Sequence, residues 1–99
     1  MNEPIENKTA SRIAVLAEAL ESQRLTINAL DDGSGVVLDV DGEQLLTMNA
    51  TALTLVQAVS DGARTEGELV TVLTDTFEVD DDPARADIRS LMKQVTEVL

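Results

Sequence analysis

The chain has 99 residues, a formal net charge of −12, no cysteine, no histidine and 1% aromatic residues. The length allows one small domain. The missing cysteine and histidine exclude disulfides, thiolate metal sites and proton transfer by imidazole. The negative charge disfavours binding to nucleic acid or to anionic membranes. Because no apolar segment is long enough to span a bilayer and no signal peptide is recognisable, we expect a cytoplasmic protein.

The N-terminal part predicts a polar tail followed by an amphipathic helix. Residues 1–8 are polar and show no period, so we expect little order there. Thr9 or Ser11 can cap a helix that continues to about Ser22. Its apolar residues share one face: Ile13, Leu16, Ala17 and Leu20. This helix either packs on its own domain or binds a partner, and both a monomer and a homodimer remain open.

The next segment predicts a three-stranded antiparallel meander. Apolar and polar residues alternate over 24–30, as in a half-buried strand, and a turn follows at 31–35. The apolar-rich runs 36–40 and 45–48 then flank Asp41-Gly42, which favours a two-residue type I′ turn. The expected register places Val40 opposite Glu43, Leu38 opposite Leu45, and Val36 opposite Thr47. In such a meander the last strand has an unpaired edge.

Two short helices are predicted after the sheet. Asn49 can cap the first, over residues 50–60, and Gly62 can end it. Thr65 opens the second through a capping box with Glu68. The expected buried face of the second helix consists of Leu69, Val72, Leu73, Thr76 and Phe77.

A third helix is predicted from Asp82, as N-cap, with Pro83 as its first residue, to near Leu99. Its expected buried face consists of Ala84, Ile88, Leu91, Met92, Val95 and Leu99.

The last predicted helix carries three of the seven cations of the chain. Arg85, Arg89 and Lys93 recur at every fourth residue and therefore form one stripe beside the apolar face. The stripe can pair with carboxylates of an acidic peptide. Alternatively, Arg85 and Arg89 balance Asp81, Asp82 and other nearby carboxylates on a solvated face.

The ordered set of signals from Leu25 to Leu99 resembles the PqqD family. The resemblance is carried by Met48-Asn49, Ala50-Thr51-Ala52, the apolar helix Leu53 to Val59, Asp61-Gly62, Thr65-Glu66, Phe77, Asp82-Pro83 and Asp87-Ile88. A meander followed by three helices also resembles a winged helix. We therefore expect an α+β, winged-helix-like domain over residues 24–99, with residues 1–23 forming a tail and an extra N-terminal helix.

The resemblance implies a non-catalytic peptide chaperone. Members of this family, also called RiPP recognition elements, bind the leader segment of a ribosomally made precursor peptide and present it to a maturation enzyme. The leader adds as a strand to the third strand and lies against the last helix, which here are residues 43–48 and 83–98. The implied peptide contacts are Leu45, Leu46, Thr47, Met48, Arg85, Arg89, Met92 and Lys93. No catalytic residue, cofactor or metal is implied.

The residues themselves support a compatible site and leave rivals open. An unpaired strand edge offers N–H and C=O groups to an extended peptide. A winged-helix regulator is disfavoured because the predicted helix after Thr65 has no Lys or Arg and several carboxylates. An acyl-carrier protein is disfavoured because Ser60 ends a helix and Ser90 lies within one. A protein adaptor without leader binding remains the main alternative.

Overall fold

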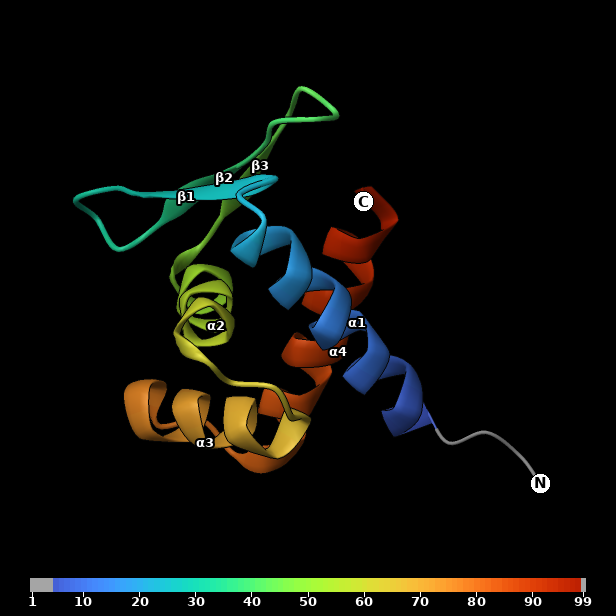
Figure 1. Ribbon diagram of the computed structural model, residues 1–99. Helices are drawn as coiled ribbons and strands as arrows, with labels where there is room; N and C mark the ends of the chain where they lie inside the picture. Colours follow the sequence, from blue (N-terminus) through green and yellow to red (C-terminus); the bar gives the residue numbers. More distant parts are fainter. Residues whose placement is uncertain (1–4, 99) are drawn as a thin grey trace.

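The computed structural model describes residues 5–98. Its elements are α1 (Ile5–Glu21), β1 (Leu25–Ala29), β2 (Gly35–Asp39), β3 (Gln44–Met48), α2 (Ala50–Asp61), α3 (Glu66–Phe77) and α4 (Asp81–Val98). This order confirms the expected α+β class. The sheet forms one end of the molecule, α1 crosses α4, and α3 lies at the opposite end (Figure 1). No helix in the described range is long and apolar enough to cross a membrane.

The sheet is an antiparallel meander with the strand order β1-β2-β3. Val36 pairs with Thr47 and Leu38 with Leu45, as expected, whereas the third expected pair, Val40 and Glu43, lies in the loop and not in the strands. β3 is an edge strand because it pairs only with β2 among the described strands. The hydrophobic core lies between the inner face of the sheet and the helices.

The predicted type I′ turn is wrong. β2 ends at Asp39 and β3 begins at Gln44, so residues 40–43 form a longer loop. Glu43, with φ 54°, has the left-handed backbone conformation in this loop, whereas Gly42 has no positive φ. Gly42 is needed for space instead, since a Cβ there would lie 2.6 Å from Asp39 Oδ2. Four-residue hairpin loops of this kind preserve the register of a two-residue turn.

α1 begins earlier than predicted. It starts at Ile5, so residues 5–8 are helical, while residues 1–4 of the expected tail lie outside the described residues. Thr9 is buried inside the helix, and neither it nor Ser11 is an N-cap. Ile13 and Leu16 are fully buried in the same core cluster as residues of the sheet and the other helices. α1 therefore shares one core with the domain expected over residues 24–99.

The caps of α2 and α3 are confirmed. Asn49 Oδ1 accepts the Ala52 N–H at 2.8 Å, and Gly62 ends α2 with φ 127°. Thr65 and Glu68 form the capping box of α3. On α3, Leu69 and Leu73 are buried as expected, Val72 and Phe77 are half-buried, Val70 is an additional buried residue, and Thr76 is exposed.

α4 starts two residues earlier than predicted. The helix begins at Asp81, and the Ala84 N–H donates to the Asp80 carbonyl oxygen at 3.1 Å. Asp82 is thus in the first turn rather than at the N-cap, and Pro83 is the third helical residue. Pro is tolerated there because that N–H has no partner within a helix. The buried face is confirmed for Ala84, Ile88, Leu91, Met92 and Val95, and Leu99 lies outside the described residues.

Candidate functional site

A groove separates the free edge of β3 from α4. One hollow of about 250 Å³ is lined by Leu46, Thr47, Met48, Asn49, Ala52, Leu91, Gln94 and Val95. A second hollow of about 190 Å³ is lined by Asn49, Thr51, Ala52, Leu55, Asp87, Ser90, Leu91 and Gln94. The two hollows share Asn49, Ala52, Leu91 and Gln94, so they are parts of one groove, which we call the β3–α4 groove.

Local sequence explains why the groove forms. β3 ends at Met48 and the Asn49 cap starts α2 immediately, so the chain turns away from the strand without a long connection. Leu91 and Val95 pack against the core and hold α4 beside this turn. The spacing of three and four residues then places Asp87 and the other lining residues of α4 along one side of the helix.

The β3 edge presents both backbone and side chains. Its outer edge is unpaired within residues 5–98, so backbone groups along it are available to an added strand. Leu46 is half-buried and lines the groove, and Met48 is 4% exposed. Leu45, by contrast, is 65% exposed and lines neither hollow. Successive strand side chains point to opposite faces, so Leu45 belongs to the outer face of the sheet.

Two of the predicted cationic contacts are engaged elsewhere. Arg85 Nη1 donates to Glu66 Oε2 at 2.8 Å, and Arg89 Nη2 donates to the same oxygen at 3.1 Å. Glu66 is the first residue of α3 and is 9% exposed. Neither arginine lines the groove. The 3.6-residue period puts Arg89 on the side of α4 opposite to Asp87. Glu66 thus engages both arginines, a carboxylate on another helix that the sequence did not single out.

The structure also places Met92 and Lys93 outside the groove. Met92 is fully buried in the core, so its side chain has no exposed surface for the predicted contact with a peptide. Lys93 is exposed but lines neither hollow.

Comparison with known proteins identifies the family. The model of the family described as "Coenzyme PQQ synthesis protein D (PqqD)" matches residues 34–98. The chain belongs to the PqqD family. The match contains β2, β3 and the three helices that follow, and so the whole β3–α4 groove. No significant match to a curated protein or to a solved structure was found. Membership makes this chain an accessory protein of PQQ- or RiPP-type biosynthesis.

Sequence reasoning missed most of the α4 lining of this PqqD-family domain. Ser90 and Gln94 were not recognised as lining residues, and Asp87 entered only as part of the family pattern. A helical wheel would have found them, because they share the side of α4 that lies next to Leu91 and Val95. The stripe of Arg85, Arg89 and Lys93 lies on another side of α4.

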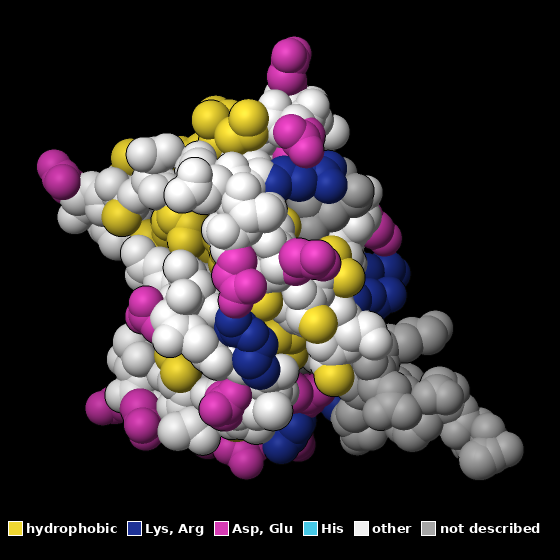
Figure 2. Space-filling model, in the orientation of Figure 1, with side chains coloured by type: hydrophobic (Ala, Val, Ile, Leu, Met, Phe, Trp, Pro, Cys, Tyr) yellow, Lys and Arg dark blue, Asp and Glu magenta, His cyan; other side chains and the backbone are white. Residues whose placement is uncertain are grey.

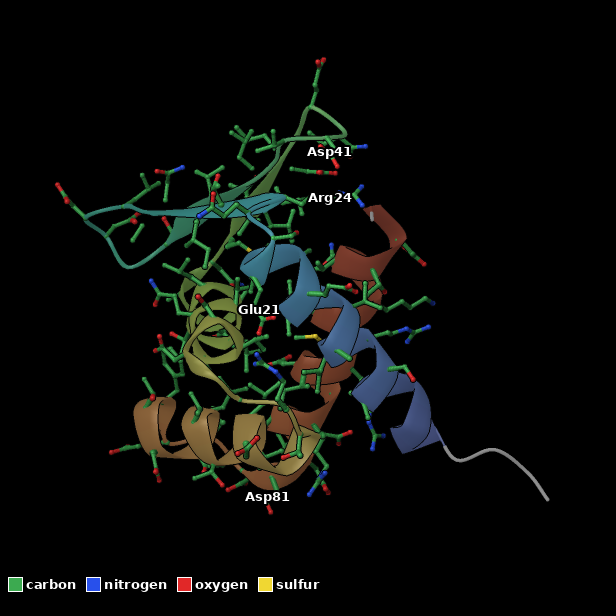
Figure 3. All side chains as sticks on the ribbon, viewed as in Figure 1. Glu21, Arg24, Asp41 and Asp81 are labelled. Atoms are coloured by element: carbon green, nitrogen blue, oxygen red, sulfur yellow. The ribbon has the colours of Figure 1, made fainter. Side chains whose placement is uncertain are left out.

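The hairpin that carries β3 in this PqqD-family chain is held by a buried carboxylate. Arg24 Nε and the Gly42 N–H each donate to Asp39 Oδ1 at 3.2 Å. Arg24 Nε also lies 3.8 Å from Asp41 Oδ2, at the corner where β1 starts near the β2–β3 loop (Figure 3). Burial raises the pKa of the Asp39 carboxyl, but the hydrogen bonds from Gly42 and Arg24 outweigh it and leave this pKa below its usual range.

The outer face of the PqqD-family sheet exposes aliphatic side chains. Leu38, Val40 and Leu45 are 37%, 51% and 65% exposed, and Leu30 is 50% exposed. Figure 2 shows hydrophobic side chains at the sheet end of the molecule, with acidic side chains at the hairpin tips. Leu38 and Leu45 are cross-strand partners, so their side chains are neighbours on this face.

Proposed function

We propose that this chain is a non-catalytic peptide chaperone. It captures the leader segment of a ribosomally synthesised precursor peptide and presents it to a maturation enzyme. The observation that carries the proposal is the edge of β3, which has no pairing strand within residues 5–98 and lies across the groove from α4. The family match over the same elements supports it.

Strand addition explains how the groove would bind a peptide. An extended peptide in the groove pairs its backbone with the free N–H and C=O groups of β3. Its side chains alternate, so every second one points toward α4. There they meet an apolar surface of Leu46, Leu91 and Val95. The backbone contacts supply affinity, and the groove selects the side chains.

The proposed contact set differs in part from the sequence prediction. From β3 it keeps Leu45, Leu46, Thr47 and Met48 as the edge to which the peptide adds. From α4 it takes the groove-lining residues Asp87, Ser90, Leu91, Gln94 and Val95. It leaves out Arg85, Arg89, Met92 and Lys93, because none of them lines the groove. The cytoplasmic location and the monomer or homodimer state stay predictions.

The test is an NMR titration of the isotope-labelled protein with the leader region of a short precursor encoded beside its gene. We expect the largest amide shifts in β3 and in α4 from Asp87 to Val95, together with slower exchange of the β3 amides that gain partners. Shifts confined to α1 and α3 would overturn strand addition. A folded protein that shows no shift with such peptides would overturn leader binding.

The exposed outer face of the sheet favours a second candidate function, a protein adaptor. Scattered exposed aliphatic residues are normal, but Leu38 and Leu45 are direct neighbours with Val40 beside them. The face does not overlap the groove, so an adaptor and a leader chaperone can coexist in one domain. Co-elution of the maturation enzyme with the wild-type protein, but not with Leu38→Ser, would support the adaptor. Equal co-elution would overturn this use of the face.

A further inference from the structure

We infer that the β3–α4 groove selects peptides that carry a Lys or Arg side chain where they pass Asp87. This inference rests on the proposed function and names the chemistry of the peptide that the groove binds. It reverses the expectation that cations of α4 recognise an acidic leader.

Asp87 is the sole ionisable residue among those that line the two hollows. It is exposed, and within residues 5–98 no hydrogen bond or ion pair engages its carboxylate. Its neighbours in the smaller hollow include Asn49, Thr51, Ser90 and Gln94. These side chains carry neutral oxygen acceptors that can share the N–H groups of an ammonium or guanidinium.

No cation of the described chain competes for this carboxylate in the groove. Arg85 and Arg89 donate to Glu66 on the side of α4 that faces α3. Lys93 lines neither hollow. The whole chain carries a net charge of −12, which adds a general attraction for a basic peptide. A peptide lying over Asp87 also removes water from it, so a cationic partner is favoured and an acidic one is repelled.

The start of α2 is a feature of the groove that favours an anion. Helix N-termini carry partial positive charge and free N–H groups. Here, however, Asn49 Oδ1 accepts the Ala52 N–H at 2.8 Å, so one of these donors already has a partner. The cap therefore leaves fewer free N–H groups to bind an anion, whereas the Asp87 carboxylate carries a full negative charge.

The arrangement also predicts the spacing of the recognised residues. The apolar part of the groove contains Val95, and the charged part contains Asp87, eight positions earlier on α4. A helix rises 1.5 Å per residue, so these parts are about 12 Å apart along α4. An extended peptide covers about 3.3 Å per residue. A peptide that follows the groove should thus carry its basic residue about four positions from the apolar residue at Val95.

The experiment selects binders from a display library of random short linear peptides. Wild-type protein, Asp87→Asn and Asp87→Lys are compared with Asp75→Asn, which removes an exposed carboxylate of α3 away from the groove. We expect wild type and Asp75→Asn to enrich Lys or Arg about four positions from an aliphatic residue. Asp87→Asn should lose this enrichment, and Asp87→Lys should enrich Asp or Glu at the same position. In one selected peptide, Lys→Gln should weaken binding to wild type about three- to tenfold and leave binding to Asp87→Asn unchanged.

Four results would overturn the inference. Enrichment of basic residues that persists in Asp87→Asn would assign the preference to the overall charge of the chain. Enrichment of acidic residues by wild type and by Asp87→Asn alike would assign the preference to the start of α2. Selected peptides that shift the β3 amides but show no charge preference would refute the role of Asp87 and leave the chaperone function intact. A folded protein that selects no peptide would refute both the role of Asp87 and the chaperone function. Because Asp87 is exposed, its variants are expected to fold, which thermal unfolding by circular dichroism verifies.

Discussion

The carboxylate of Glu66 joins α3 to α4 by accepting a hydrogen bond from Arg89 Nη2 at 3.1 Å, and a second one from Arg89 Nε at 3.4 Å. Glu66 is 9% exposed, while the arginine side chain is 36% exposed. The buried apolar face of α4, which includes Ile88 and Met92, sets the rotation of the helix about its axis, and the pair adds a polar contact on the side toward α3. In this orientation the cationic side of α4 lies against α3, and Asp87 lies on the groove side.

The first prediction concerns this pair. Glu66→Gln removes the charge but keeps the size of the side chain, so two arginines lose their shared carboxylate. We expect the free energy of unfolding to fall by about 1–2 kcal/mol, less than for a fully buried pair because the arginines remain partly in water. Urea denaturation measures it, with Glu18→Gln on the exposed side of α1 as the control. Equal midpoints for the two variants would contradict the prediction.

Reversing the charge of Arg89 separates stability from peptide binding. Arg89→Glu places a second carboxylate against Glu66, so we expect a lower thermal midpoint than for wild type. Peptide affinity, measured by calorimetry at a temperature where both proteins are folded, should change less than about twofold, since Arg89 does not line the groove. A loss of affinity for an acidic leader would restore the cation stripe as a binding site.

Variants of two adjacent residues of β3 test which face of the sheet the peptide contacts. Leu46→Ala removes apolar surface from the groove and should weaken leader affinity roughly fivefold, equivalent to about 1 kcal/mol. Leu45→Ala is the matched control, because this side chain is 65% exposed on the outer face. Isothermal titration of the leader with both variants measures the difference. The opposite ranking would show that the peptide lies over the outer face.

Replacement of Gly35 and of Gly67 by alanine should change the free energy of unfolding in opposite directions. A Cβ at Gly35 would lie 2.8 Å from the Asn28 carbonyl oxygen and 2.7 Å from Leu53 Cδ1. The backbone oxygen is held in the sheet, so Gly35→Ala should destabilise the fold by about 1–3 kcal/mol. Gly67→Ala, in α3 with open space around it, should stabilise by up to about 1 kcal/mol. Chemical denaturation of both variants tests the difference in sign.

The capping box of α3 predicts an acid-side loss of stability. The Arg64 N–H and the Thr65 N–H donate to Glu68 Oε1 at 2.7 and 3.1 Å, and these bonds lower the pKa of Glu68. A carboxyl whose pKa is lower in the folded state stabilises the fold above its unfolded pKa. This contribution is lost as the pH falls below about 4 and through the folded pKa.

Glu68→Gln tests this contribution. The free energy of unfolding of this variant should be lower than that of wild type at neutral pH, and the two values should converge in acid. Urea denaturation of both proteins from neutral to acidic pH measures the difference. Glu97→Gln serves as the control, because the Glu97 side chain makes no hydrogen bond within residues 5–98. A gap between wild type and Glu68→Gln that is independent of pH would contradict the assignment.

The caps of α2 and α3 are local signals that the sequence predicts correctly, whereas the expected caps of α1 and α4 are wrong. The Asn49 cap and the Thr65–Glu68 capping box depend on atoms within one turn of a helix, and both are present. The strand register was also predicted, because a four-residue loop pairs Leu38 with Leu45 as a two-residue turn would. The turn type itself was wrong, since the Asp39 carboxylate beneath Gly42 shapes this loop.

The sequence by itself determined the order of elements, the apolar face of α4 and the family, because these depend on periodicity and local caps. Only the tertiary structure decided which sides of α4 meet α3 and the groove. Arg85 and Arg89 form a stripe in any helix, yet their role depends on Glu66, which lies about twenty residues earlier in the chain. The packing of α4 against α3 thus takes two cations away from the groove and leaves Asp87 in it, beside the start of α2.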